Sequence, residues 1–235
     1  MSDLHLHPPM TLGRVHARLG WLVPAIGLLF VLLAVGAAFD SLPWDRPITD
    51  AAIDARSPSR DDFALAVSRM GSTPVVLSVA ALVSAAAWPR CRRLAIAIVV
   101  LALARPLVEF GFKELVGRDR PVGDRLVNGR GPSFPSGHPF AAAASWGFVP
   151  LVAALYTRRR ALWWAAAIGA WGLVVLIAAS RVWLGVHWAS DVVGGVLLAL
   201  LGVVGAERLI VAAHHGGGCE SARDADRRAV AAAER

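Results

Sequence analysis

The chain has 235 residues, of which 56% are hydrophobic and 17% are charged, and its formal net charge is +7. This composition is too apolar for an ordinary soluble domain and is typical of a protein that crosses a membrane several times. Nucleic-acid binding, a common role of basic proteins, is not expected, because the arginines occupy short connections between apolar runs and form no basic surface interleaved with aromatic residues.

Six apolar runs follow one another along the chain. A hydrocarbon core of about 30 Å requires about 20 helical residues, and each run is close to that length. The runs cover residues 21–39, 70–88, 94–112, 139–157, 161–180 and 189–206. We therefore predict an all-α protein, a six-transmembrane helix bundle over residues 20–212, with a cytoplasmic segment before it (1–19) and a flexible cytoplasmic tail after it (213–235).

The first apolar run has a second interpretation, as a secretory signal. Arg14 and Arg18 precede it, and the small residues Val35, Gly36 and Ala37 suit a cleavage site. The run is long for a signal peptide, so an uncleaved membrane anchor is the preferred interpretation and cleavage is the alternative.

The connection after the first run (residues 40–69) is rich in aspartate, with six Asp against four Arg. At its end, Phe63, Val67 and Met70 lie at i, i+4 and i+7, which predicts a short helix with an apolar stripe. This helix is expected to lead into the second run, and a lid over a functional site is the alternative.

The short connections indicate how the chain is oriented in the membrane. The connections at 89–93 and 158–160 carry arginines without an acidic residue, and two more arginines precede the first run. Six crossings place all of them on one side, which the positive-inside rule assigns to the cytoplasm. The expected location is therefore the cytoplasmic (inner) membrane, with both termini in the cytoplasm and the connections 40–69, 113–138 and 180–191 at the extracytoplasmic rim.

Two charges, Arg105 and Glu109, interrupt the third apolar run. They are four residues apart on one helix face, and charges inside a membrane are usually paired. We expect an ion pair that braces a nearby site, with direct contact to a substrate as the alternative.

The connection at 113–138 is long, glycine- and proline-rich, and ends directly at the fourth run. Loops of this length in a compact bundle are usually functional or disordered. Ser136, Gly137 and His138 precede Pro139, which suits the first turn of a helix. Free backbone N–H groups at such a helix start, next to small residues, are suited to binding an anion.

A third polar cluster precedes the last apolar run. His187 and Asp191 are four residues apart and therefore share a helix face. A carboxylate in that position can accept the proton of one imidazole nitrogen, fix the tautomer and leave the other nitrogen with a free lone pair. Cations for a phosphoryl group of about two negative charges are available on the same side of the membrane, from Lys113, Arg120 and Arg181.

Together these clusters resemble the three motifs of the type 2 phosphatidic acid phosphatases, a family that shares its site with the vanadium-dependent haloperoxidases. The family patterns are Lys-x6-Arg-Pro, Pro-Ser-Gly-His and Ser-Arg-x5-His-x3-Asp. All occur here in order, within residues 105–195, as Lys113 to Pro121, Pro135 to His138 and Ser180 to Asp191. Three complete signatures in order make a chance match negligible.

The resemblance implies a role for each matched position. His187 would attack phosphorus, Asp191 would hold and polarise it, and His138 would protonate the leaving oxygen and then activate water. The phosphoryl oxygens would be bound by Lys113, Arg120, Ser136, the Gly137 amide and Arg181. Pro121 and Ser180 would support the pocket, with Arg105 and Glu109 bracing it. The family needs no cofactor and no metal, and the sequence contains no carboxylate cluster for magnesium and no HExxH or CxxC pattern.

The expected function is therefore a metal-independent lipid phosphatase that forms a phosphohistidine at the extracytoplasmic face. Its partners are a lipid phosphate substrate and the membrane lipids, and the oligomeric state is left open. Undecaprenyl diphosphate, a polyprenyl diphosphate, is the first substrate candidate because the site faces outward. Alternatives are phosphatidate, phosphatidylglycerol phosphate, or transfer of the phosphate to an alcohol. A transporter would not need both His138 and His187.

Overall fold

The computed structural model describes residues 21–157 and 159–212. This part of the chain is helical and contains no strand, which confirms the all-α prediction for the described residues. The predicted N-terminal segment (1–19) and C-terminal tail (213–235) lie outside the described residues and stay predictions.

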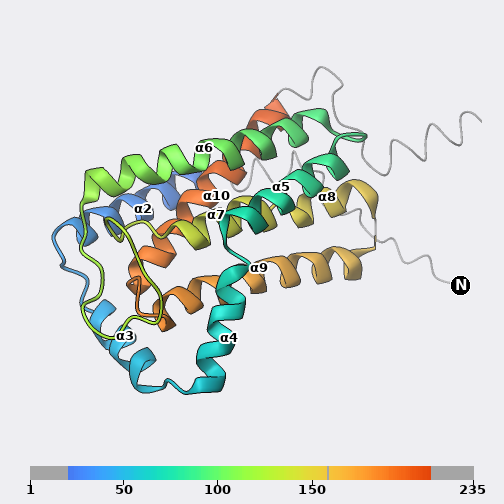
Figure 1. Ribbon diagram of the computed structural model, residues 1–235. Coiled ribbons are helices and arrows are strands. Elements are labelled where there is room, and N and C mark those ends of the chain that lie inside the picture. Colours follow the sequence, from blue (N-terminus) through green and yellow to red (C-terminus); the bar gives the residue numbers. More distant parts are fainter. Residues whose placement is uncertain (1–20, 158, 213–235) are drawn as a thin grey trace, which may run out of the picture.

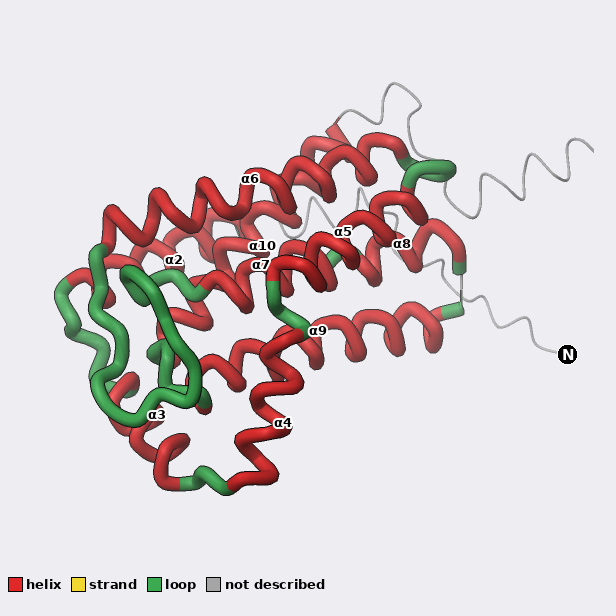
Figure 2. The backbone as a smooth tube through the Cα atoms, viewed as in Figure 1, coloured by secondary structure: helices red, strands yellow, loops and turns green. Residues whose placement is uncertain are grey.

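Nine helices are described, and most of them run along a common direction (Figure 1). Helix α3 (Asp45–Asp54) and the long loop between α6 and α7 lie at one end of this bundle, and α4 (Pro58–Arg69) runs across the common direction (Figures 1 and 2). The helices are α2 (Leu22–Ala38), α3 (Asp45–Asp54), α4 (Pro58–Arg69), α5 (Thr73–Ala87), α6 (Arg92–Val116), α7 (Gly137–Trp146), α8 (Val149–Tyr156), α9 (Arg160–Trp183) and α10 (Ala189–Ala212).

Four of the described helices are long and apolar enough to cross a membrane: α6, the α7–α8 pair, α9 and α10. A fifth candidate is the pair α4–α5, which is bent by 48° at a short break, and α2 is an apolar helix of 17 residues. All six predicted apolar runs are therefore helical. The number of spans that length and composition support is four to five, so the predicted count of six is not confirmed.

Helix α7 lies at the centre of the bundle and packs against α5, α6, α9 and α10. Its residues from Pro139 to Ser145 are all buried. Long apolar side chains on α6, among them Leu103 and Leu107, are instead exposed, as expected of a helix that faces lipid. The buried position of α7 fixes where its N-terminus, with the Pro-Ser-Gly-His motif, lies in the molecule.

The fourth predicted span is not one continuous helix. Helix α7 ends at Trp146 and α8 begins at Val149, with Gly147 and Phe148 in a turn between them. Pro150 lies in the first turn of α8, where its missing N–H cannot bond to the carbonyl four residues before it. The fourth predicted run therefore contains a turn, and α7 and α8 together are still long and apolar enough to cross a membrane.

Candidate functional site

The three motifs, far apart in the sequence, meet at the end of the bundle where the α6–α7 loop lies. Arg120, from this loop, donates to the carbonyl of Val186 at 2.8 Å, next to His187. The backbone N–H of Ser136, at the start of α7, donates to the carbonyl of Asp191 at 3.0 Å. The first motif therefore contacts the third, and the second motif is hydrogen-bonded to the third.

His187 and Asp191 form the pair that their spacing predicted. Nδ1 of His187 is 3.3 Å from Oδ2 of Asp191, and the same oxygen accepts from the backbone N–H of Trp188 at 2.9 Å. Both side chains are buried, with exposed fractions of 3% for His187 and 0% for Asp191. A proton assigned to Nδ1 from this contact leaves the lone pair on Nε2, which accepts a hydrogen bond from Nη1 of Arg120 at 3.1 Å.

The environment of His187 keeps its imidazole neutral. Burial lowers the pKa of His187 to about 4, although its hydrogen bond to Asp191 and the charge of that carboxylate act in the opposite direction. The positive charges of Arg120 and Arg181 act in the same direction as burial and contribute to this lowered pKa. A neutral imidazole with its lone pair on the side of the cations is suited to attack an electrophile that those cations bind.

His138 lies in the first turn of α7, half-buried, and shares the electrostatic environment of His187. Its imidazole interacts electrostatically with the cations Arg181, Arg105 and Lys113 and with the imidazole of His187. Its ring also lies against Gly71, in the connection between α4 and α5, where an added Cβ would come within 3.3 Å of His138 Cδ2. The structure therefore brings both predicted imidazoles into one site.

The three predicted phosphate-binding cations are each held by partners within the protein. Arg120 donates to the carbonyls of Arg130 and Gly131 as well as to that of Val186. Arg181 donates to the hydroxyl of Ser68 at 2.6 Å. Lys113 Nζ lies 3.1 Å from a carboxylate oxygen of Glu109.

Two buried polar atoms of the predicted phosphate-binding set have no hydrogen-bond partner in the described part of the chain: Ser136 Oγ and Arg181 Nε. A buried polar group without a partner costs about 1–3 kcal/mol, so such groups in native proteins call for an explanation. Both groups are donors, and both belong to motifs that meet at His187. A phosphoryl group bound beside the imidazoles would provide the acceptors that these donors lack.

Four residues were expected to support the pocket: Arg105, Glu109, Pro121 and Ser180. Arg105 and Glu109 form the expected ion pair at 2.6 Å. Pro121 is buried, and its carbonyl accepts two hydrogen bonds from Arg125. The hydroxyl of Ser180 donates to the carbonyl of Ile177 in its own helix at 2.6 Å, so this side chain is bonded to α9 and not to a motif residue.

Arg118, a buried arginine that was not predicted as a site residue, binds the carboxylate oxygen of Asp191 that does not face His187. Its Nη1 donates to Asp191 Oδ1 at 2.9 Å and to Ser190 Oγ at 2.7 Å, and its Nη2 donates to Asp45 Oδ2 at 2.7 Å. Burial alone would lower the pKa of Arg118, but the charges and hydrogen bonds of Asp191 and Asp45 have a larger effect and raise it. No sequence pattern links Arg118 to Asp45, which lies 73 residues earlier.

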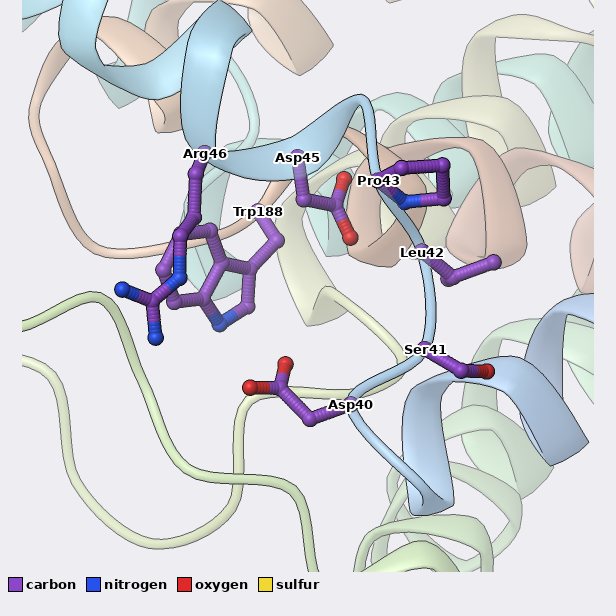
Figure 3. A pocket seen from close by; sticks show the side chains of 7 residues that line it. All are labelled: Asp40, Ser41, Leu42, Pro43, Asp45, Arg46 and Trp188. Carbon is purple, nitrogen blue, oxygen red and sulfur yellow. The ribbon is translucent and has the colours of Figure 1, made fainter.

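A pocket of about 280 Å³ lies beside this network, next to Trp188 (Figure 3). In Figure 3 the side chains of Asp40 and Asp45 are turned toward the space between the α2–α3 connection and Trp188. The charged side chains that line this pocket are the carboxylates of Asp40 and Asp45 and the guanidinium of Arg46. The pocket is lined by Asp40, Ser41, Leu42, Pro43, Asp45, Arg46 and Trp188.

Comparisons with known proteins agree with this geometry. The PAP2 superfamily matches residues 93–215, which is just over half of the chain. Phosphatidylglycerophosphatase B of Bacillus subtilis (strain 168) is 27% identical over 181 residues, covering 74% of this chain and 87% of that protein.

Two solved structures are similar to the present one. One is a transmembrane PAP2 type phosphatidylglycerolphosphate phosphatase from Bacillus subtilis, with a TM-score of 0.69, 26% identity, and coverage of 80% of this chain and 96% of that chain. The other is LpxE of Aquifex aeolicus, with a TM-score of 0.55, 17% identity, and coverage of 73% and 96%, which supports the fold alone. The resemblance found in the three motifs is confirmed: the chain belongs to the PAP2 superfamily and is an integral membrane phosphatase.

Proposed function

We propose that this protein removes the phosphate of a membrane lipid through a covalent phosphohistidine at His187. The observation that carries the proposal is the placement of the His187 ring, with Nδ1 toward Asp191 and Nε2 toward Arg120. This arrangement leaves a neutral nitrogen directed at the cationic cluster that would hold the phosphoryl group.

In the first step, the lone pair of His187 Nε2 forms a bond to phosphorus. The bond between phosphorus and the lipid oxygen breaks, and protonated His138 gives its proton to that oxygen, so that the lipid leaves as a neutral alcohol or as a lipid monophosphate. Proton transfer to a leaving group by a positioned histidine contributes about 10²–10⁴-fold to a rate. Asp191 stabilises the positive charge that develops on the His187 ring.

In the second step, His138 accepts a proton from a water molecule as its oxygen attacks phosphorus. The bond between phosphorus and His187 Nε2 breaks, which returns the neutral imidazole and releases inorganic phosphate. His138 is protonated again at the end of the cycle, ready for the next leaving group.

The phosphoryl oxygens gain charge during both steps, and fixed donors stabilise that charge. Ser136 Oγ and Arg181 Nε, two of the buried donors that lack a partner among the described residues, would each bind one oxygen. The remaining donors that we propose are Lys113, Arg120 and the Gly137 amide. Among the described residues, no three His, Cys, Asp or Glu side chains are grouped as metal ligands, and metal independence stays part of the proposal.

We also propose that the chain crosses the cytoplasmic membrane six times, with α2 in the first span and α5 in the second. The arginine-rich connections support a cytoplasmic position for the opposite end of the bundle and for both termini. The motif end then faces the extracytoplasmic side, where the substrate headgroup would enter.

Two lipids are the leading substrate candidates. Phosphatidylglycerol phosphate is supported by the names of the Bacillus subtilis relative and the Bacillus subtilis crystal structure that this chain resembles. Undecaprenyl diphosphate is supported by the outward orientation inferred from the sequence. Phosphatidate, and transfer of the phosphate to an alcohol in place of water, are the alternatives that the same chemistry allows.

The test is phosphate release by the detergent-solubilised protein from each of these three lipids, with EDTA present. The wild-type protein should release phosphate, with its highest kcat/KM for one of the two leading candidates. His187→Ala should be inactive, while the matched control His16→Ala, outside all three motifs, should be as active as wild type. Turnover by His187→Ala, or a strict need for added magnesium, would contradict the proposal.

A further inference from the structure

Glu109 binds two cations of the site at once. One carboxylate oxygen lies 2.6 Å from Arg105 Nη1, and the other lies 3.1 Å from Lys113 Nζ. All three side chains project from successive turns of α6 and are largely shielded from solvent, with exposed fractions between 11% and 17%. An ion pair in such surroundings is screened less than one at a surface, so the electrostatic attraction between Glu109 and Lys113 is strong.

The same carboxylate also lies against the anion-binding motif at the start of α7. A Cβ added to Gly137 would collide with Glu109 Cδ and with both of its carboxylate oxygens. The absence of a side chain at Gly137 therefore leaves room for Glu109. The negative charge of Glu109 also stabilises the positive charge of Arg120.

These contacts place a carboxylate between two groups that the phosphoryl oxygens would use, Lys113 and the Gly137 amide. A carboxylate and a phosphoryl group carry the same sign of charge and bind the same kinds of donor. When a phosphate binds, Lys113 must divide its interaction between the two anions, and the anions repel each other.

We propose that Glu109 is an internal anion that competes with phosphate for Lys113 and thereby weakens the affinity of the site for its inorganic product. This inference rests on the function proposed above. A lipid substrate has apolar contacts along its tail in addition to its phosphate, whereas free phosphate has only the cations. A built-in competitor therefore favours release of the product while the substrate still binds through its tail.

The test is equilibrium binding of radiolabelled inorganic phosphate to the detergent-solubilised protein, which requires no turnover. Glu109→Gln keeps the size and one oxygen acceptor but removes the charge, so we expect phosphate to bind about tenfold more tightly than to wild type. Glu114→Gln is the matched control, because Glu114 is an exposed carboxylate on the same helix, next to Lys113, and its removal should leave the affinity unchanged. Equal affinity for wild type and Glu109→Gln would overturn the inference.

Glu109→Gln leaves the positive charge of Arg105 without its partner, which could prevent folding, so a second comparison is needed. The double variant Arg105→Gln/Glu109→Gln removes the pair together and should bind phosphate about tenfold more tightly than Arg105→Gln alone. Equal affinities there would also overturn the inference. Failure of the proposed function is a different result: wild type and Glu114→Gln would then hydrolyse none of the lipid phosphates, whatever the binding measurements gave.

Discussion

Arg118 and Asp191 form a buried ion pair directly behind the His187 imidazole, with 2.9 Å between Arg118 Nη1 and Asp191 Oδ1. The other oxygen of Asp191 faces His187 Nδ1 and the Trp188 backbone N–H. Arg118 is held in turn by Asp45, which also accepts from the backbone N–H of Ser190 at 2.8 Å. The orientation of His187 therefore depends on α3, a helix from the first extramembrane connection.

We predict that Arg118→Lys lowers kcat about 100-fold with little change in KM, because misplacing a reacting group by about 1 Å has an effect of that size. Lysine keeps the charge but cannot bind Asp191 and Asp45 with two nitrogens at once. Arg125→Lys is the matched control and should keep its kcat. Arg125 is an exposed residue of the same loop that donates to the Pro121 carbonyl and does not contact Asp191. The measurement is steady-state kinetics. An unchanged kcat, or a change in KM alone, would contradict the prediction.

The lowered pKa of His187 predicts a pH dependence of stability. Between pH 6.5 and about 4 the unfolded chain takes up a proton at this histidine, while the folded protein keeps it neutral. Unfolding is therefore favoured as the pH falls through that window, and above pH 6.5 the residue contributes no pH dependence. The midpoint of thermal unfolding of wild type should fall relative to that of His187→Ala as the pH is lowered from 6.5 to 4. A constant difference across the window would show that His187 has an ordinary pKa.

Close packing between α10 and the start of α7 predicts opposite effects of two glycine substitutions. A Cβ at Gly195 would collide with the backbone carbonyl of Ser136, which cannot move without moving the Pro-Ser-Gly-His motif. Gly195→Ala should therefore lower both the unfolding midpoint and kcat. Gly205→Ala, in the same helix, meets nothing within 4 Å and should stabilise the protein by about 0.5–1 kcal/mol. Thermal unfolding and activity assays on both variants would decide, and similar behaviour of the two would contradict the packing argument.

The proposed role of His138 predicts a dependence on the leaving group. For a lipid alcohol, His138→Ala should lower phosphoenzyme formation about 10²–10⁴-fold. An aryl phosphate with an acidic phenol needs no proton on departure, so the variant should still release a burst of phenolate before slow turnover. Stopped-flow absorbance measures this burst. An equal decrease in the rate of phosphoenzyme formation for the two substrates would contradict the role of His138 as the general acid.

The apolar runs predicted the helices well because membrane spans are determined by local composition. The three motifs likewise indicated residues that the structure brings together. The contact between Glu109 and Lys113 was missed, although their spacing of four residues was a sufficient signal. The break after Trp146 was missed for a similar reason, since Pro150 was visible within the run.

Other features had no signal in the sequence. The network of Arg118 with Asp45 joins positions 73 residues apart, and such a contact depends on how the helices pack. The same is true of Arg181, whose partner Ser68 lies 113 residues away in α4. In both cases the residue types allow many partners, and only the tertiary structure selects one.

The central claim, that His187 carries the phosphoryl group, is tested most directly by rapid quenching of the protein with a lipid substrate that carries a radiolabelled phosphate. We predict a labelled protein whose label is lost in acid and kept in alkali, as a phosphohistidine requires, and which peptide mapping assigns to position 187. Turnover without a labelled intermediate, or a label that persists in His187→Ala, would contradict the account.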